Sequence, residues 1–313
     1  MTRQEIPIFF SADDNYVPCL SVAIKSLVDN SSKENDYKIM ILNAGMDNKS
    51  KKELKEFEGE NIKIDFKDIS TATKKIAKAL SLRLRDYYSA TIYYRMFIPS
   101  MFPEYEKAIY LDSDIVLLDD IVNFYNMDLG TNLLAVVKDE VVNGNASFRK
   151  YSKIALGLDA VKYFNSGVLL MNLKAIRENK IEDRFISMLV KYNLDTIAPD
   201  QDYLNVLCKD KVLYLPENWN KMPDFGKKIK EDELHLIHYN MYRKPWHYAD
   251  VPYSNVFWRY AKETKYYELL QENMKKYSEK EKKDDIDAGV KLVKYSEEIM
   301  TQDIKFVDII DKI

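Results

Sequence analysis

The sequence predicts an α/β fold, a Rossmann-like mixed sheet flanked by helices, followed by a helical C-terminal appendage. The sheet is predicted because short apolar runs alternate with amphipathic stretches along the first part of the chain. The appendage is predicted by a change of composition at about Lys262, beyond which charged residues dominate and apolar residues recur at helical spacing. We expect residues 1–261 to form one domain and residues 262–313 the appendage.

The elements follow from the apolar runs in chain order. The first five segments alternate strand, helix, strand, helix and strand: Ile6–Phe10, Val17–Val28, Tyr37–Leu42, Lys49–Glu60 and Ile62–Phe66. This order implies parallel strands with helices on both faces of the sheet. Later strands are expected at Ala108–Leu111, Leu133–Val137, Gly167–Asn172, Val212–Leu215 and Leu234–His238. Later helices are expected at Tyr87–Phe102, Ile181–Tyr192 and Gln201–Cys208.

Composition excludes several classes of protein. Of the 313 residues 46% are hydrophobic, which suffices for a large core, and 47 basic against 50 acidic residues leave no positive excess for nucleic acid. Cys19 and Cys208 form no CxxC pair, so we expect a reducing, cytoplasmic compartment. No signal peptide and no run of about 20 apolar residues is visible, so we expect at most peripheral membrane contact, at the inner face.

An apolar run ends abruptly in two acids at Asp112-Ser113-Asp114. Alternate residues of a strand point the same way, so we expect both carboxylates to face one spot at the edge of the sheet, where they repel each other unless a cation lies between them. Oxygen ligands of this kind suit Mg²⁺ or Mn²⁺. The alternative interpretation is a polar turn after a strand.

A second alternative is a phosphatase. Apolar residues followed by DxDx[TV] present the aspartate nucleophile of haloacid-dehalogenase-like phosphatases, and Asp112, Asp114 and Val116 fit that pattern. Those enzymes place the motif near the start of the catalytic domain, whereas a whole βαβαβ unit precedes it here. The glycine-led acidic pair that they need downstream is also missing.

Other polar groups follow further strands. The chain has eight glycines and no GxGxxG or GxxxxGK[ST] sequence, so side chains and a metal must bind any phosphate. Asp13 and Asp14 follow the first strand, where they either cap the next helix or also bind a nucleotide. His238 ends a later strand, and an imidazole beside two carboxylates favours Mn²⁺ over Mg²⁺, although a strand-end histidine can also be structural. Lys244 is either a solvated loop residue or a diphosphate ligand.

In order and spacing, these residues resemble glycosyltransferase family 8, which includes bacterial lipooligosaccharide galactosyltransferases and glycogenin. The resemblance covers roughly residues 6–248. It implies a GT-A catalytic domain over residues 1–261 that transfers a hexose, galactose or glucose, from a UDP-sugar with retention at the anomeric carbon. The acceptor implied is a bacterial cell-surface glycan or glycolipid precursor.

The resemblance also implies roles for individual residues. The first-strand segment of the family, which contacts uridine, is matched by Ala12, Asp13 and Asn15. The metal and diphosphate group is matched by Asp112, Ser113 and Asp114 of the DxD motif, by His238 as third metal ligand, and by Lys244. Many members have glycine in the loop before that lysine, whereas this chain has Tyr239-Asn240-Met241-Tyr242-Arg243, which puts backbone contact to the diphosphate in doubt.

The sugar-binding residues are implied in the same way. Arg95 is expected to contact the donor sugar or diphosphate, and Asp139 matches another acid of the donor-sugar site. Asn165 and Ser166 lie in Phe-Asn-Ser-Gly-Val-Leu-Leu-Met-Asn-Leu, a run that on its own is a good buried strand. In the Asp-Gln-Asp motif, Asp200 is expected to bind sugar hydroxyls and Gln201 to lie beside the anomeric carbon.

The implied mechanism is front-face attack by the acceptor. Double displacement needs a carboxylate beneath the anomeric carbon, whereas Gln201 is an amide and a weak nucleophile. We expect the loop Val142–Tyr151 and residues Asn218–Phe225 to recognise the acceptor, and the C-terminal helices to pack on the domain or form a homo-oligomer. The alternative from another class is a sugar-nucleotide-binding module without catalysis.

Overall fold

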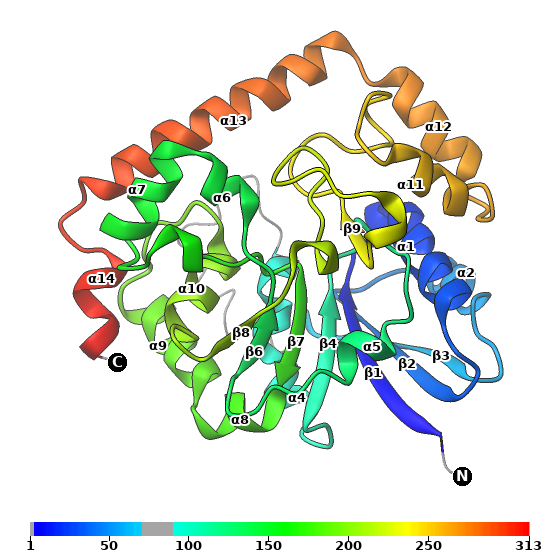
Figure 1. The fold of residues 1–313 in the computed structure, drawn as a ribbon, viewed down its shortest axis with the longest axis horizontal. Helices are drawn as coiled ribbons and strands as arrows, with labels where there is room; N and C mark the ends of the chain where they lie inside the picture. Colours follow the sequence, from blue (N-terminus) through cyan, green and yellow to red (C-terminus); the bar gives the residue numbers. More distant parts are fainter. Residues whose placement is uncertain (1–2, 71–89, 313) are drawn as a thin grey trace. The chain divides into compact units, whose positions relative to one another are not determined.

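A computed structural model describes residues 3–70 and 90–312 (Figure 1). The chain divides into two compact units, and each is described by itself. Unit 1 comprises residues 1–68, 108–128 and 216–285, and unit 2 comprises residues 69–107, 129–215 and 286–313.

The sheet of unit 1 has the strand order β3-β2-β1-β4, with every neighbouring pair parallel. Its strands are β1 (Gln4–Ser11), β2 (Asn35–Asn43), β3 (Ile62–Asp68) and β4 (Lys107–Leu111). Ile8, Phe9 and Phe10 of β1 are all fully buried, which is the pattern of a strand covered on both faces. The βαβαβ prediction is therefore confirmed.

The helices of unit 1 include α1 (Val17–Asn30), α2 (Asn48–Lys55), α5 (Val122–Tyr125), α11 (Ser254–Ala261) and α12 (Tyr267–Lys276). Short 3-10 helices lie at η1 (Asp14–Tyr16), η4 (Glu217–Trp219) and η5 (Glu231–Glu233). The helix expected to run to Glu60 ends at Lys55, because Phe57, Glu58 and Gly59 turn the chain towards β3. Their backbone N–H groups donate to Leu54, Lys55 and Ile62.

A two-stranded antiparallel sheet in unit 1 joins β5 (Ile115–Leu117) to β9 (Leu236–His238). Ile115 pairs with His238, and the Tyr239 N–H donates to the Asp114 carbonyl at 2.9 Å. Val116 and Ile237 from these strands join an apolar cluster with Phe257 of α11. This pairing brings the acids that follow β4 next to a residue more than a hundred positions later.

Unit 2 contains β6 (Leu134–Val136), β7 (Val168–Asn172) and β8 (Val212–Tyr214), where β6 pairs antiparallel with β7 and parallel with β8. Its helices are α4 (Ile98–Met101), α6 (Glu140–Gly144), α7 (Ala146–Ile154), α8 (Leu173–Glu178), α9 (Ile181–Lys191), α10 (Pro199–Leu207) and α14 (Phe306–Ile309). Its 3-10 helices are η2 (Ala90–Phe97), η3 (Ala160–Lys162) and η6 (Ile310–Lys312).

Two predictions within unit 2 need correction. The segment Val142–Tyr151, expected to be a loop, lies within α6 and α7. The Asp139 carboxylate caps α6, and the Asn145 side chain accepts from two N–H groups at the start of α7. The helix expected at Tyr87–Phe102 is a 3-10 helix followed by one α turn over residues 90–101, and its first residues lie outside the described part of the chain.

The C-terminal region is helical, as predicted. The long helix α13 (Glu279–Met300) begins in unit 1 and continues into unit 2. The Phe306 ring of α14 packs edge-on against Tyr203 with centroids 4.8 Å apart. Among the helices of the described residues, none has the length and apolar character needed to cross a bilayer.

Candidate active site

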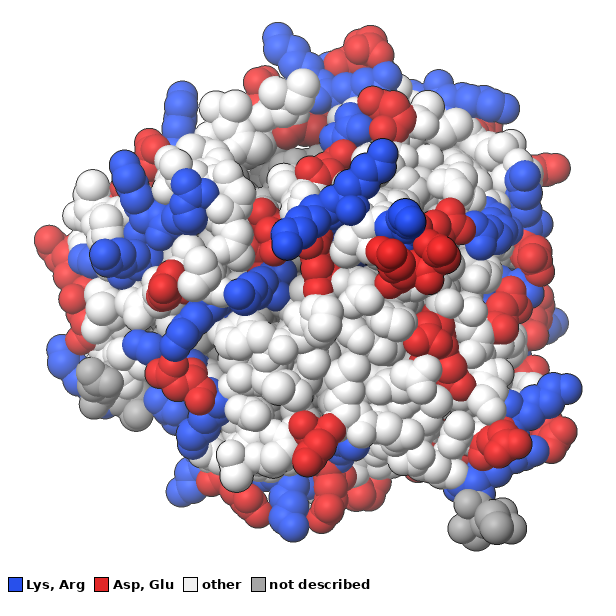
Figure 2. All heavy atoms as spheres, viewed as in Figure 1, with Lys and Arg blue, Asp and Glu red and all other residues white. Residues whose placement is uncertain are grey.

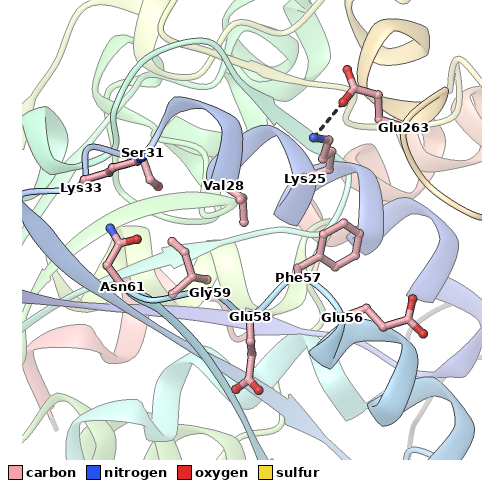
Figure 3. A pocket seen from close by; sticks show the side chains of 11 residues that line it. Lys25, Val28, Ser31, Lys33, Glu56, Phe57, Glu58, Gly59, Asn61 and Glu263 are labelled. Atoms are coloured by element: carbon pink, nitrogen blue, oxygen red, sulfur yellow. Dashed lines mark ion pairs between the residues drawn. The ribbon is translucent and has the colours of Figure 1, made fainter.

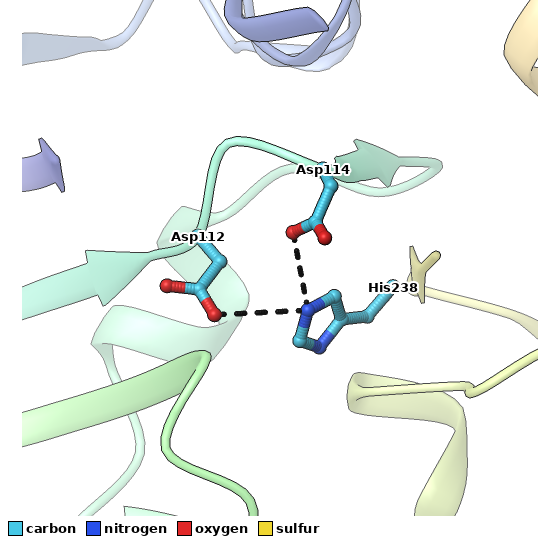
Figure 4. Close-up of side chains that lie close together, drawn as sticks. All are labelled: Asp112, Asp114 and His238. Atoms are coloured by element: carbon cyan, nitrogen blue, oxygen red, sulfur yellow. Dashed lines mark ion pairs between the residues drawn. The ribbon is translucent and has the colours of Figure 1, made fainter. Parts of the chain in front are cut away.

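The Asp112 and Asp114 carboxylates and the His238 imidazole of unit 1 converge, with ligand atoms within 4.8 Å of one another. Figure 4 shows the three side chains turned towards one point. His238 Nε2 lies 3.2 Å from Asp114 Oδ1 and 3.7 Å from Asp112 Oδ2. Both acids lie in the connection between β4 and β5, beyond the strand, so a turn rather than strand alternation brings them together.

A buried amide sets the orientation of the imidazole. His238 Nδ1 lies 3.0 Å from Asn220 Oδ1, and both residues are at most 2% exposed. An amide oxygen accepts hydrogen bonds only, so Nδ1 carries a proton, and Nε2 is the ring nitrogen that can bind a cation beside the acids. The two carboxylates repel each other unless a cation lies between them. This donor set therefore fits a divalent metal ion of the Mg²⁺ or Mn²⁺ type.

Lys244 joins this group from the loop after β9. Its ammonium is buried and donates to Asp114 Oδ2 and to the Tyr239 carbonyl. Burial alone would lower the pKa of Lys244, but the charge of Asp114 outweighs it and raises that pKa. Burial would likewise raise the pKa of Asp114, but Lys244 and His238 outweigh it and hold that pKa well below its ordinary value.

The predicted nucleotide segment follows β1 in unit 1. Asp13 Oδ1 accepts from the N–H groups of Asn15 and Tyr16 at 3.0 and 3.2 Å, so this acid caps η1. Ala12 is buried, whereas the Asn15 side chain is exposed. The Ser113 hydroxyl donates to the Ser11 carbonyl at 3.0 Å. This bond joins the ends of β1 and β4, which places the segment beside the acids of the metal group.

The predicted sugar-site residues form a second, buried group within unit 2. The Arg95 guanidinium pairs with Asp200 Oδ2 at 3.0 Å and donates to the carbonyl and hydroxyl of Ser166. The Ser166 hydroxyl in turn donates to Asp200 Oδ2 at 3.0 Å. All three residues are at most 7% exposed. The charge of the arginine is thus balanced by an acid on the first turn of α10.

The Gln201 amide lies at the centre of that group. Its Oε1 accepts from the Ser166 N–H at 2.8 Å and from Asn165 Nδ2 at 3.2 Å. Its Nε2 donates to Asp139 Oδ2 at 3.1 Å and to the Tyr163 hydroxyl at 3.2 Å. The same oxygen of Asp139 accepts from Asn165 at 3.1 Å. A polar cluster this closely bonded has little freedom to rearrange.

A family model described as "Glycosyl transferase family 8" matches residues 7–250. The chain belongs to glycosyl transferase family 8. A lipopolysaccharide 1,2-glucosyltransferase of Escherichia coli K12 is 29% identical over 286 residues, which cover 87% of this chain and 79% of the relative.

Two solved structures are similar to this chain in fold. The galactosyltransferase LgtC, solved with donor and acceptor sugar analogs, matches with a TM-score of 0.66 and 25% identity, over 83% of this chain and 96% of that chain. The bifunctional glycosyltransferase WbbM matches with a TM-score of 0.73 and 24% identity, over 87% of this chain and 52% of that chain, about half its length. The chain therefore has the GT-A fold of a family 8 glycosyltransferase.

Several residues of the described site were missed by the sequence analysis. Asn220 has no pattern around it that would reveal its contact with His238. Tyr151 and Tyr163 both donate to the buried carboxylate of Asp202. Asp202 is the last acid of the Asp-Gln-Asp motif, so the motif itself could have drawn attention to it.

A surface depression of ≈ 440 Å³ in unit 1 includes none of the metal-group residues Asp112, Asp114 and His238 in its lining (Figure 3). Most of its lining residues precede β2 or β3, at the amino ends of the strands, whereas the metal group follows the carboxyl end of β4. Lys25 at its edge is already paired with Asp29 at 2.6 Å and Glu263 at 2.8 Å. Ligands of parallel α/β sheets bind at the carboxyl ends, so we assign no ligand to this depression.

Proposed function

We propose that this family 8 glycosyltransferase transfers a hexose, glucose or galactose, from a UDP-sugar to an acceptor with retention at the anomeric carbon. The observation that carries the proposal is the convergence of Asp112, Asp114 and His238 in a chain of this family. These residues would hold Mn²⁺, or Mg²⁺, which when bound stabilises the negative charge that develops on the departing UDP.

The chain's own residues have separate roles in this proposal. Ala12, Asp13 and Asn15 bind the uridine, and Ser113 supports the metal group. Lys244 has a raised pKa, so it stays an ammonium and donates to the diphosphate as the negative charge grows. In the structure this ammonium is held by Asp114, so it exchanges a carboxylate for a phosphate oxygen when the donor binds.

The hexose is bound by the polar group of unit 2. Asp200, held by Arg95, and Asp139 accept hydrogen bonds from sugar hydroxyls, and Asn165 and Ser166 line the same site. Gln201 lies beside the anomeric carbon, where its amide orients the sugar and stabilises an oxocarbenium-like state. An amide is a weak nucleophile, so the acceptor attacks on the face from which UDP leaves.

We further propose that the acceptor is a bacterial cell-surface glycan or glycolipid precursor. The similarity to a lipopolysaccharide glucosyltransferase supports this class of acceptor. On the face in Figure 2, Lys and Arg are interspersed with Asp and Glu, so electrostatic attraction between this face and a polyanion would be weak. In this proposal residues 1–261 form the catalytic domain, and residues 262–313 form a helical appendage that packs on that domain or associates with a second copy of the chain.

The location of the protein follows the same proposal. Cys19 and Cys208 are both free and buried, which fits a reducing compartment. We therefore propose a cytoplasmic enzyme whose contact with the membrane, where its glycolipid acceptor would lie, is peripheral.

Calorimetric titration of UDP, UDP-glucose and UDP-galactose, each with Mn²⁺ and then with EDTA, tests the proposal. Metal-dependent binding together with transfer or slow hydrolysis supports it, and a preference between the sugars names the donor. Absence of UDP binding under every condition would refute it. Tight binding with neither transfer nor hydrolysis would favour a binding module, whereas the phosphatase alternative has no support from the family match.

A matched pair of variants tests the metal group. Asp114→Asn should lower transfer by roughly 10²–10³, the loss typical of one preorganised electrostatic group. Asp119→Asn is the control, because Asp119 is a more exposed acid of the same unit that pairs with His235 at 2.8 Å. Equal turnover by the two variants would contradict the assignment.

A further inference from the structure

The proposed function leaves one fully buried carboxylate unused. Asp202 is 0% exposed, and its two oxygens accept four hydrogen bonds. Oδ1 accepts from the Tyr163 hydroxyl at 2.6 Å, and Oδ2 accepts from the Tyr151 hydroxyl at 2.8 Å and from the N–H groups of Ile197 and Ala198 at 3.0 and 3.3 Å. A charge removed from water requires such partners.

One of these partners also touches the glutamine of the proposed sugar site. The Tyr163 hydroxyl has a single proton, and it donates that proton to Asp202. Its oxygen can then only accept, and it accepts from Gln201 Nε2 at 3.2 Å. Because Asp202 can only accept, it fixes the direction of both hydrogen bonds: Gln201 donates to Tyr163, and Tyr163 donates to Asp202.

A rotated Gln201 amide would be unfavourable at both ends. With Oε1 and Nε2 exchanged, the amide nitrogen would face the Ser166 N–H, donor against donor, and the amide oxygen would face the Asp139 carboxylate. The terminal torsion of glutamine has two broad, nearly equivalent orientations, so only such contacts select one. Tyr163 supplies an acceptor on the nitrogen side of the amide.

We propose that Asp202 and Tyr163 are positioning residues, which act through a buried hydrogen-bond relay to hold the Gln201 amide with its nitrogen towards Tyr163 and its oxygen towards Ser166. This inference rests on the proposed function, in which Gln201 lies beside the anomeric carbon. Neither Asp202 nor Tyr163 touches the sugar in this scheme.

Tyr151 offers a matched control. Its hydroxyl donates to Oδ2 of the same carboxylate, at a distance similar to that of Tyr163, but its bond is to Asp202 and not to the glutamine amide. Tyr151→Phe and Tyr163→Phe each remove one buried hydroxyl and one hydrogen bond to Asp202. Only the second variant also removes one of the two acceptors of Gln201 Nε2.

The experiment compares Tyr163→Phe and Tyr151→Phe in the wild-type and Gln201→Ala backgrounds. We expect similar losses of stability in urea, but a fall in kcat of about tenfold for Tyr163→Phe alone, with the KM for the UDP-sugar within about twofold. In the Gln201→Ala background, Tyr163→Phe should lower kcat no further, because the two residues act as one unit. Equal effects of the two Phe variants on kcat, or additive losses with Gln201→Ala, would overturn the relay.

A spectroscopic arm separates this inference from the proposed function. In protein labelled with ¹⁵N-glutamine, Gln201→Ala assigns the Gln201 side-chain amide signals by their disappearance. Tyr163→Phe should shift these signals strongly and Tyr151→Phe only weakly, whether or not the protein transfers sugar. Shifts of equal size would refute the relay, whereas absence of transfer by the wild type would refute the proposed function alone.

Discussion

The pH dependence of stability should reveal the burial of Asp202. Burial raises the pKa of this carboxyl from 3.8 to about 6, and the hydrogen bonds from Tyr163 and Tyr151 oppose the rise only in part. These two tyrosines donate to the carboxyl, and the charge of Asp202 also contributes to the raised pKa of the neighbouring Tyr203. Burial and the charge of Asp202 raise the pKa of Tyr151 and Tyr163 well above the usual range, so both stay neutral.

The direction of the effect follows from the two pKa values. Between pH 3.8 and 6 the unfolded chain gives up the proton of Asp202 while the folded protein keeps it, so rising pH favours the unfolded state. A difference of about 2.2 pH units corresponds to about 3 kcal/mol in full, of which about 2 kcal/mol falls between about pH 4.5 and 7.5. Asp202→Asn resembles the neutral carboxyl and does not titrate.

The assay is urea unfolding of the wild type and Asp202→Asn across this pH range, because the variant lacks the titrating carboxyl at position 202. The stability of the wild type relative to the variant should fall by about 2 kcal/mol from about pH 4.5 to 7.5. A difference that is flat, or that rises with pH, would refute the reasoning. It would mean that the four donors hold the folded pKa at or below that of the unfolded chain.

Three further predictions follow from the other buried contacts. Arg95→Ala should lower the free energy of unfolding in urea by about 3–5 kcal/mol, because it removes the cation paired with the buried Asp200; a loss under about 1 kcal/mol would contradict this. Asn220→Ala should weaken Mn²⁺ binding in calorimetry by about 10–100-fold, because the orientation of His238 is lost, and unchanged affinity would count against that role. Lys244→Met should strengthen Mn²⁺ binding in the absence of nucleotide by about fivefold or more, because it removes an ammonium that repels the metal ion. This effect is a small part of the ~4 kcal/mol between unit charges 4 Å apart near a surface. Weaker Mn²⁺ binding by the variant would contradict this role of Lys244.

The sequence predicts the strands of this fold better than its short or irregular parts. β1 and β2 carry apolar runs bounded by polar residues, β3 alternates apolar and polar residues, and all three are present close to the predicted bounds. β5 has three residues, too few to show a pattern, so its pairing with β9 could not be predicted. Asn143-Gly144-Asn145, a sequence typical of a turn, ends α6 and caps α7, and both helices begin at residues whose side chains cap them.

In the candidate site, too, some residues could be predicted from the sequence and others could not. The carboxylates of the metal group could be predicted because they directly follow an apolar strand, and His238 because it ends another. The contacts that orient the site could not, since Tyr151 and Tyr163 lie 51 and 39 positions from Asp202 and meet it only through tertiary packing. Tyr151 follows Lys150 and Tyr163 follows Lys162, so the neighbouring residues in the sequence give no sign that either tyrosine is buried.

The Asp-Gln-Asp run can serve three purposes because it forms the first turn of a helix. Successive residues of a helix point about 100° apart, so Asp200, Gln201 and Asp202 reach different partners: a buried cation, a backbone N–H and two tyrosine hydroxyls. In a strand the two acids would share one face and repel each other. Asp202 also accepts from the two N–H groups that precede Pro199, so the acid that orients Tyr163 also fixes where α10 begins. Removing this carboxylate should therefore displace Asp200, the proposed sugar-binding acid, together with Gln201, and not the glutamine alone.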